Sequence, residues 1–168
     1  MDTTLKRQRT ALGLAKRGGN TVSLEENKAI VRRLVEAFNK HDLSLLDELM
    51  GFDYFDHRHQ LRGLRSYKQL LTVIFNAFPD YHETLEDIIA EGDKVWIRDT
   101  VTGTHKGEYR GLAPTGKEIK GEMVVILRIV DGKVVEGWEV SDMLHTLKQI
   151  GAIRYTEKGK KLFPEDVS

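Results

Sequence analysis

Apolar residues recur at helical spacing through the first half of the chain. Residues 23–42 begin with Ser23 and Glu26, a pair that matches a capping box at a helix N-terminus. The apolar positions that follow lie on one helical face and are Ile30, Val31, Leu34, Val35 and Phe38. Leucines in residues 43–50 predict a second, short helix. After an extended segment at residues 52–63, a third apolar stripe continues until Pro79 ends it.

Beyond Pro79 the apolar period changes from that of a helix to alternation. Residues 81–93, 94–105, 119–130 and 133–141 read as strands, and Asp131-Gly132 predicts a two-residue hairpin turn between the last two. A short helix follows at residues 143–151 and ends at Gly151. Helices followed by a meander of strands predict an α+β fold. Helices that lie in the concavity of a curved sheet would leave a pocket between the two layers.

The hairpin turn predicts which residues face that pocket. Counting back from Val130 and Lys133 sets the register of the last two strands. The predicted pairs are Leu127 with Glu136, Val125 with Trp138, and Met123 with Val140. This apolar face continues to Asp142, where a low dielectric would raise the pKa of the carboxyl group towards the range useful for proton transfer. Aspartate is also a favoured N-cap for the helix that follows, so a pocket acid and a helix cap both remain open.

The segment "DYFDHRHQ" at residues 53–60 is the other polar cluster. In an extended conformation, His57 and His59 share one face with Phe55. These histidines could point into the pocket as hydrogen-bonding or acid/base groups, or they could lie in a surface loop. A third metal ligand is not evident, and we therefore predict no metal site.

Composition narrows the class of protein. The 168 residues contain no internal repeat, so we expect one domain at residues 23–153, a basic N-terminal arm at residues 1–22 and a polar tail at residues 154–168. Lysine plus arginine and aspartate plus glutamate both number 26, which argues against a nucleic-acid partner. The chain has no cysteine, no apolar run long enough for a membrane span and no secretory signal, so a cytoplasmic protein without membrane attachment is expected.

Two segments, "GTHKGEYRGLAPTGK" and "DGKVVEGWEVSD", are the more specific parts of a resemblance that extends over residues 23–153. The chain resembles the SnoaL-like polyketide cyclases of the nuclear transport factor 2-like superfamily. The resemblance implies a cone-shaped α+β barrel with a mostly antiparallel sheet, a deep apolar pocket and a homodimer formed through the sheet. It also implies that Asp142 matches an aspartate that acts as acid/base in the intramolecular aldol closure of a polyketide methyl ester, without metal or organic cofactor. His57 matches a histidine that lines the pocket.

These features together predict a pocket for a small apolar carbonyl-containing ligand. Asp142 would remove a proton α to a carbonyl and His57 would polarise an oxygen. The residues expected to bind the substrate are His59, Trp138, Phe38 and Phe75. One alternative is a hydrolase similar to limonene epoxide hydrolase, which needs an Arg-x-Asp on one strand face, whereas the adjacent Arg98 and Asp99 point to opposite faces. If Arg98 pointed inward, Asp99 would lie at the surface. Another alternative is a non-catalytic ligand-binding or dimerisation module in which Asp142 is only a cap.

Overall fold

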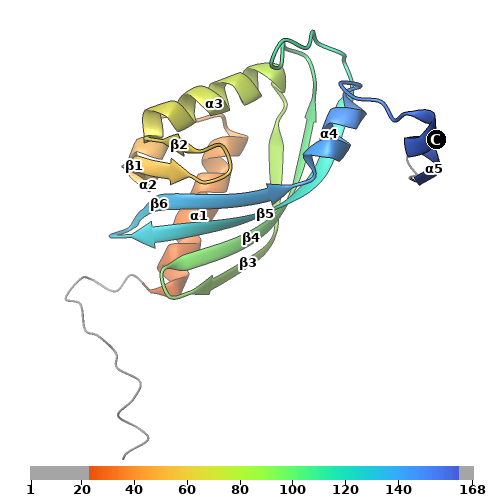
Figure 1. Cartoon of the computed structure of the whole chain (residues 1–168). Coiled ribbons are helices and arrows are strands. Elements are labelled where there is room, and N and C mark those ends of the chain that lie inside the picture. The colour runs from red at the N-terminus through yellow and green to blue at the C-terminus, as the bar shows by residue number, and fades with distance from the viewer. Residues whose placement is uncertain (1–22, 163–168) are drawn as a thin grey trace, which may run out of the picture.

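A computed structural model describes residues 23–162 and confirms the predicted α+β fold (Figure 1). The elements are α1 (Leu24–Asn39), α2 (Leu46–Leu49), β1 (Met50–Asp56), β2 (Leu61–Arg62), α3 (Leu64–Ala77), β3 (His82–Glu91), β4 (Lys94–Thr104), β5 (Glu118–Val130), β6 (Lys133–Ser141), α4 (Met143–Gln149) and α5 (Glu157–Leu162). The basic arm predicted for residues 1–22 lies outside the described residues, as do residues 163–168. No helix within residues 23–162 is long and apolar enough to cross a membrane.

The six strands form one curved sheet in the order β2-β1-β6-β5-β4-β3. All neighbouring strands are antiparallel except β1 and β6, which run parallel. Figure 1 shows the long strands bending, with α1 and α3 together on one side of the sheet. The main core lies between this concave face and the helices, where Val31, Leu34, Val95 and Leu127 are buried.

Local signals in the sequence account for the ends of several elements. Ser23 and Glu26 form the predicted capping box, in which the Glu26 N–H donates to Ser23 Oγ at 3.2 Å and the Ser23 N–H donates to the Glu26 carboxylate. The third helix ends at Ala77, two residues before Pro79, as expected. Asp131 and Gly132 both have positive φ, which the primed hairpin turn requires. The short helix α5 lies within the segment expected to be a polar tail.

The predicted register of β5 and β6 is correct at the turn but wrong beyond it. Val130 pairs with Lys133 and Ile129 with Val134, but Arg128 pairs with Glu136, so Val135 is an extra residue in β6. Such a bulge moves every later side chain to the other face of the strand. The pairs in the structure are Leu127 with Gly137, Val125 with Glu139, and Met123 with Ser141. The concave face therefore receives Gly137, Glu139 and Ser141 in place of Trp138, Val140 and Asp142.

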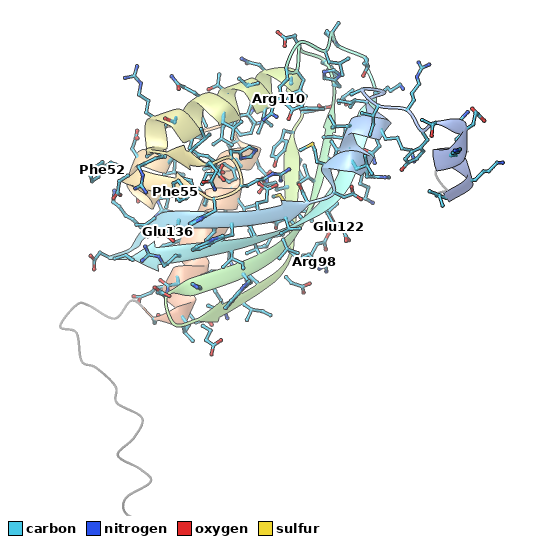
Figure 2. The ribbon with its side chains drawn as sticks, in the orientation of Figure 1. Phe52, Phe55, Arg98, Arg110, Glu122 and Glu136 are labelled. Carbon is cyan, nitrogen blue, oxygen red and sulfur yellow. The ribbon has the colours of Figure 1, made fainter. Side chains whose placement is uncertain are left out.

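The alternation in β4 places Asp99 inward and Arg98 outward. Asp99 is fully buried, whereas the Arg98 guanidinium bonds with the Asp87 carboxylate at 2.7 Å and the Glu122 carboxylate at 3.5 Å. Figure 2 shows Arg98 and Glu122 on the side of the sheet away from α3. The Arg-x-Asp arrangement of the epoxide hydrolase alternative therefore lacks its arginine on the pocket side.

Candidate functional site

An apolar cavity of about 170 Å³ lies between the concave face of the sheet and the helices. Its apolar walls come from Leu34 and Phe38 of α1, Leu71 of α3, Ile97 of β4 and Leu127 of β5. The polar side chains that reach it come mainly from β1, the start of β3, the last residues of β6 and the turn after β1. The cavity thus combines low-dielectric walls with a few placed polar groups, as ligand pockets do.

Asp56 and His59 form a hydrogen-bonded pair at the wall made by β1. The Asp56 side chain accepts the backbone N–H groups of Arg58 at 2.9 Å and His59 at 3.2 Å, which holds the turn after β1. Its second oxygen lies 2.7 Å from His59 Nδ1. Since a carboxylate only accepts, Nδ1 carries the proton and Nε2 is left as the basic nitrogen. Asp56 is only 5% exposed, so its carboxylate is shielded from bulk water, whereas the His59 side chain is 23% exposed.

Two phenols lie beside this pair. The rings of Tyr54 and Tyr67 pack against each other with 4.9 Å between centroids, and both residues line the cavity. Burial, with a smaller effect of nearby groups that include the Asp56 carboxylate, raises the pKa of both phenols, so both remain neutral donors. Gly137 makes room for Tyr54, because a Cβ atom at this position would overlap with Tyr54 Oη.

A second acid lies at the far side of the cavity, on the edge strand β3. Glu83 is 5% exposed, and the Tyr81 O–H donates to its Oε1. The amide of Asn39 in α1 bonds with both the N–H and the C=O of Glu83, at 2.7 and 2.8 Å, and so fixes its backbone. Burial raises the pKa of Glu83 to about 8, and the nearby Asp99 carboxyl adds to the effect. Burial also raises the pKa of Asp99 to about 6, and neither oxygen of Asp99 has a partner among residues 23–162.

A third acid of the cavity is neutralised by an ion pair. The Arg58 guanidinium donates to the Glu139 carboxylate and to Ser141 Oγ. This contact joins the turn after β1 to the end of β6. Residues 23–162 contain no cluster of three histidine or acidic side chains that could hold a metal ion.

A family model, the SnoaL-like polyketide cyclase, matches residues 28–150. The chain belongs to the SnoaL-like polyketide cyclase family. It is similar to aklanonic acid methyl ester cyclase DnrD of Streptomyces peucetius, with 31% identity over 77% of this chain and 94% of that protein. Nogalonic acid methyl ester cyclase of Streptomyces nogalater is 29% identical over 70% of this chain and 92% of its own. The crystal structure of AclR from Streptomyces galilaeus superposes with a TM-score of 0.72 at 33% identity, covering 85% of this chain and 92% of that one.

Two of the predicted site residues line the cavity of this SnoaL-like chain. They are His59 and Phe38. Phe75 is buried in the core beside the cavity, where its ring stacks on His41 with 4.2 Å between centroids. Its predicted contact with substrate is therefore not supported.

His57 and Trp138 lie on the convex face, which corrects their predicted placement. Their rings stack with 4.3 Å between centroids, and His57 Nε2 lies 3.4 Å from the Glu136 carboxylate. Strand alternation directs Phe55 and His57 outward, whereas the turn that follows returns His59 to the cavity. The bulge in β6 directs Trp138 outward.

Asp142 is exposed and does not line the cavity, so its predicted place on the apolar face is wrong. Its side chain accepts the His145 N–H at 2.9 Å and is the N-cap of α4. The bulge again accounts for the difference, because it turns Ser141 rather than Asp142 inward. The catalytic role that the family resemblance implies for Asp142 stays a prediction.

The sequence reading missed the acids that line the cavity, which are Asp56, Glu83, Glu139 and Glu122, the last of which directs its carboxylate to Arg98. A signal for Asp56 is present, since an aspartate three residues before a histidine is compatible with a turn closed by the aspartate side chain. Glu83 and Glu139 look like ordinary polar positions of alternating strands. The face of the sheet to which each of these side chains points depends on strand pairing, which the local sequence does not reveal.

Proposed function

We propose that this cavity is the active site of a cofactor-independent acid/base enzyme of the polyketide ester cyclase type. The reaction would be an intramolecular aldol closure of an apolar, carbonyl-containing substrate. The observation that carries the proposal is the Asp56–His59 pair, whose free imidazole nitrogen belongs to a residue lining an apolar cavity. The similarity to two methyl ester cyclases favours the same reaction class.

In the proposed mechanism, His59 Nε2 removes a proton from a carbon α to a carbonyl. The Asp56 carboxylate stabilises the imidazolium that forms and keeps the ring in one tautomer and orientation. The neutral phenols of Tyr54 and Tyr67 supply hydrogen-bond donors on the same wall, where charge develops on the enolate oxygen. Asp56 and His59 thus take the roles that the sequence analysis expected for Asp142 and His57.

The test is turnover of aklanonic acid methyl ester and nogalonic acid methyl ester by the purified chain. An intramolecular aldol closure gives a product of unchanged mass and new retention time, which liquid chromatography with mass detection resolves. His59→Ala should lower kcat/KM by about 10²- to 10⁴-fold, the usual contribution of one positioned acid/base. His57→Ala is the matched control, since His57 lies on the convex face, and it should leave kcat/KM unchanged. A His59→Ala variant as active as wild type would refute the assignment, and failure to convert either ester would refute the substrate class.

We also propose that the chain forms a homodimer through the convex face of the sheet. A row of apolar side chains crosses this face, because Ile89, Trp96, Ile126 and Trp138 pair across four neighbouring strands. Ile89 is 63% exposed and Val140, beside the row, is 75% exposed. Ion pairs made by Arg98 and by Glu136 flank the row (Figure 2). An apolar strip with a charged rim is the pattern of a protein interface.

A further inference from the structure

Two buried carboxyl groups on the β3 side of the molecule are not used by the His59 mechanism. Glu83 lines the cavity, and Asp99 is fully buried but is not among the residues that line it. Neither side chain forms an ion pair with a lysine, arginine or histidine within residues 23–162. A buried carboxylate without a cation is costly, and proteins commonly relieve that cost by keeping the group protonated.

The contacts of Glu83 leave one of its oxygens available. Tyr81 donates to Oε1, whereas Oε2 has no hydrogen-bond partner among the described residues. The titratable groups that face Glu83 are Tyr81 from the segment after α3, Tyr67 from α3 and Asp99 from β4, while α1 contributes the neutral Asn39. None of these groups carries a positive charge that would stabilise an ionised Glu83. Only the hydrogen bond from Tyr81 favours the ionised form, and the Asp99 carboxyl disfavours it. The pKa of about 8 agrees with this geometry.

We propose that Glu83 is a proton-donating residue that binds a carbonyl oxygen of the ligand at the side of the cavity opposite His59. The sheet order places three strands, β6, β5 and β4, between β1 and β3, so the base and this acid approach a ligand from different walls. The proposal deepens the proposed function and rests on it for the reaction step. The binding step stands on the contacts of Glu83 alone.

The step balances without a further reactant. His59 Nε2 takes the α proton, and the C–H electron pair forms the new bond to a second carbonyl carbon of the same molecule. The π electron pair of that carbonyl moves to its oxygen, which takes the Glu83 proton and becomes a hydroxyl group. The product is an isomer of the substrate. Transfer of the His59 proton back to the Glu83 carboxylate through solvent restores both groups.

The experiment measures binding of 1-indanone and indane to the full chain by equilibrium dialysis. The two probes share a planar apolar frame and differ in one carbonyl oxygen. At pH 6 the wild type should bind 1-indanone about threefold to tenfold more tightly than indane, the effect of one hydrogen bond. At pH 9.5, above the pKa of about 8, this preference should disappear. Glu83→Gln retains an N–H donor that does not titrate, so its preference should persist at both pH values.

Three further variants complete the test. Glu83→Leu should show no preference at either pH, and Glu91→Gln, a change at an exposed position of the same strand, should behave as wild type. Asp99→Asn should move the loss of preference to lower pH, because the Asp99 charge raises the pKa of Glu83. Equal affinity of the wild type for both probes, absence of binding for both, or a preference that does not change with pH would overturn the proposal. If the chain prefers the carbonyl probe but converts neither ester, the proposed role of Glu83 stands and the cyclase function is rejected. If the chain converts an ester but shows no carbonyl preference, only the proposed role of Glu83 is rejected.

Discussion

Replacement of Glu83 by glutamine should change how the stability of the protein depends on pH. Glutamine keeps the size and hydrogen-bonding capacity of a protonated glutamate but cannot ionise. In the native protein burial raises the pKa of Glu83 from 4.5 to about 8. Between these values the native state keeps a proton that the unfolded state has lost. The contribution of Glu83 to the free energy of unfolding of the wild type therefore falls as the pH rises through this interval.

The size of the effect follows from proton linkage. One proton contributes up to about 1.4 kcal/mol for each pH unit. Over the interval from pH 4.5 to about 8, the Glu83 contribution to the free energy of unfolding falls by at most about 5 kcal/mol. This value is an upper limit because local adjustment of the structure around an ionised Glu83 lowers the cost. Below pH 4 the two proteins should differ little, and above pH 8 the advantage of the glutamine variant should reach a plateau.

Urea unfolding at pH 4, 6 and 8 measures the difference directly. Glu83→Gln and wild type are compared at each pH, with Glu91→Gln as the control for loss of a carboxylate on the same strand. If the m value is the same for the two proteins, a shift of the urea midpoint reports a difference in their stability. The reasoning is refuted if the two unfolding free energies stay parallel from pH 4 to pH 8. A Glu83→Gln variant that loses stability relative to wild type as the pH rises would show that Glu83 is ionised and paired in the native protein.

Three other predictions test the site and the interface. Asp142→Ala should lower the free energy of unfolding by about 1 kcal/mol through loss of the helix cap, and Asp142→Asn by much less, with ester turnover kept in both variants. An asparagine variant that melts normally but is inactive would show that Asp142 takes part in catalysis. Gly137→Ala should lower the free energy of unfolding by about 1–3 kcal/mol because the added Cβ overlaps with Tyr54 Oη. Tyr54→Phe in the same chain should relieve part of that loss. Thermal-melt effects of the two substitutions that simply add would contradict the contact. Val140→Glu should convert the proposed dimer to a monomer in light scattering, whereas Val73→Glu on α3 should not; a wild type that is already monomeric would contradict the interface.

Periodicity in the sequence was sufficient to predict the helices α1 to α4, the strands β3 to β6 and the α+β class, but not the strands β1 and β2 or the helix α5. These elements depend on neighbours within a few residues, such as the Ser23–Glu26 capping box, the proline at position 79 and the Asp131-Gly132 turn. Each signal acts through local hydrogen bonds or allowed backbone angles, so the sequence carries it directly. The family, with its implied pocket, was recognisable from motifs in the same order along the chain.

The identity of the side chains that reach the cavity depended on the tertiary structure. A single extra residue in β6, Val135, moves Glu139 inward and Trp138 outward, because side chains of a strand alternate between faces. The turn after β1 returns His59 to the cavity, where the Asp56 carboxylate binds its backbone and its ring. The acidity of Glu83 depends on burial by α1 and α3 and on the nearby Asp99, which is distant in sequence. Periodic burial is a property of each segment, whereas register, turn closure and local dielectric are properties of segments packed against one another.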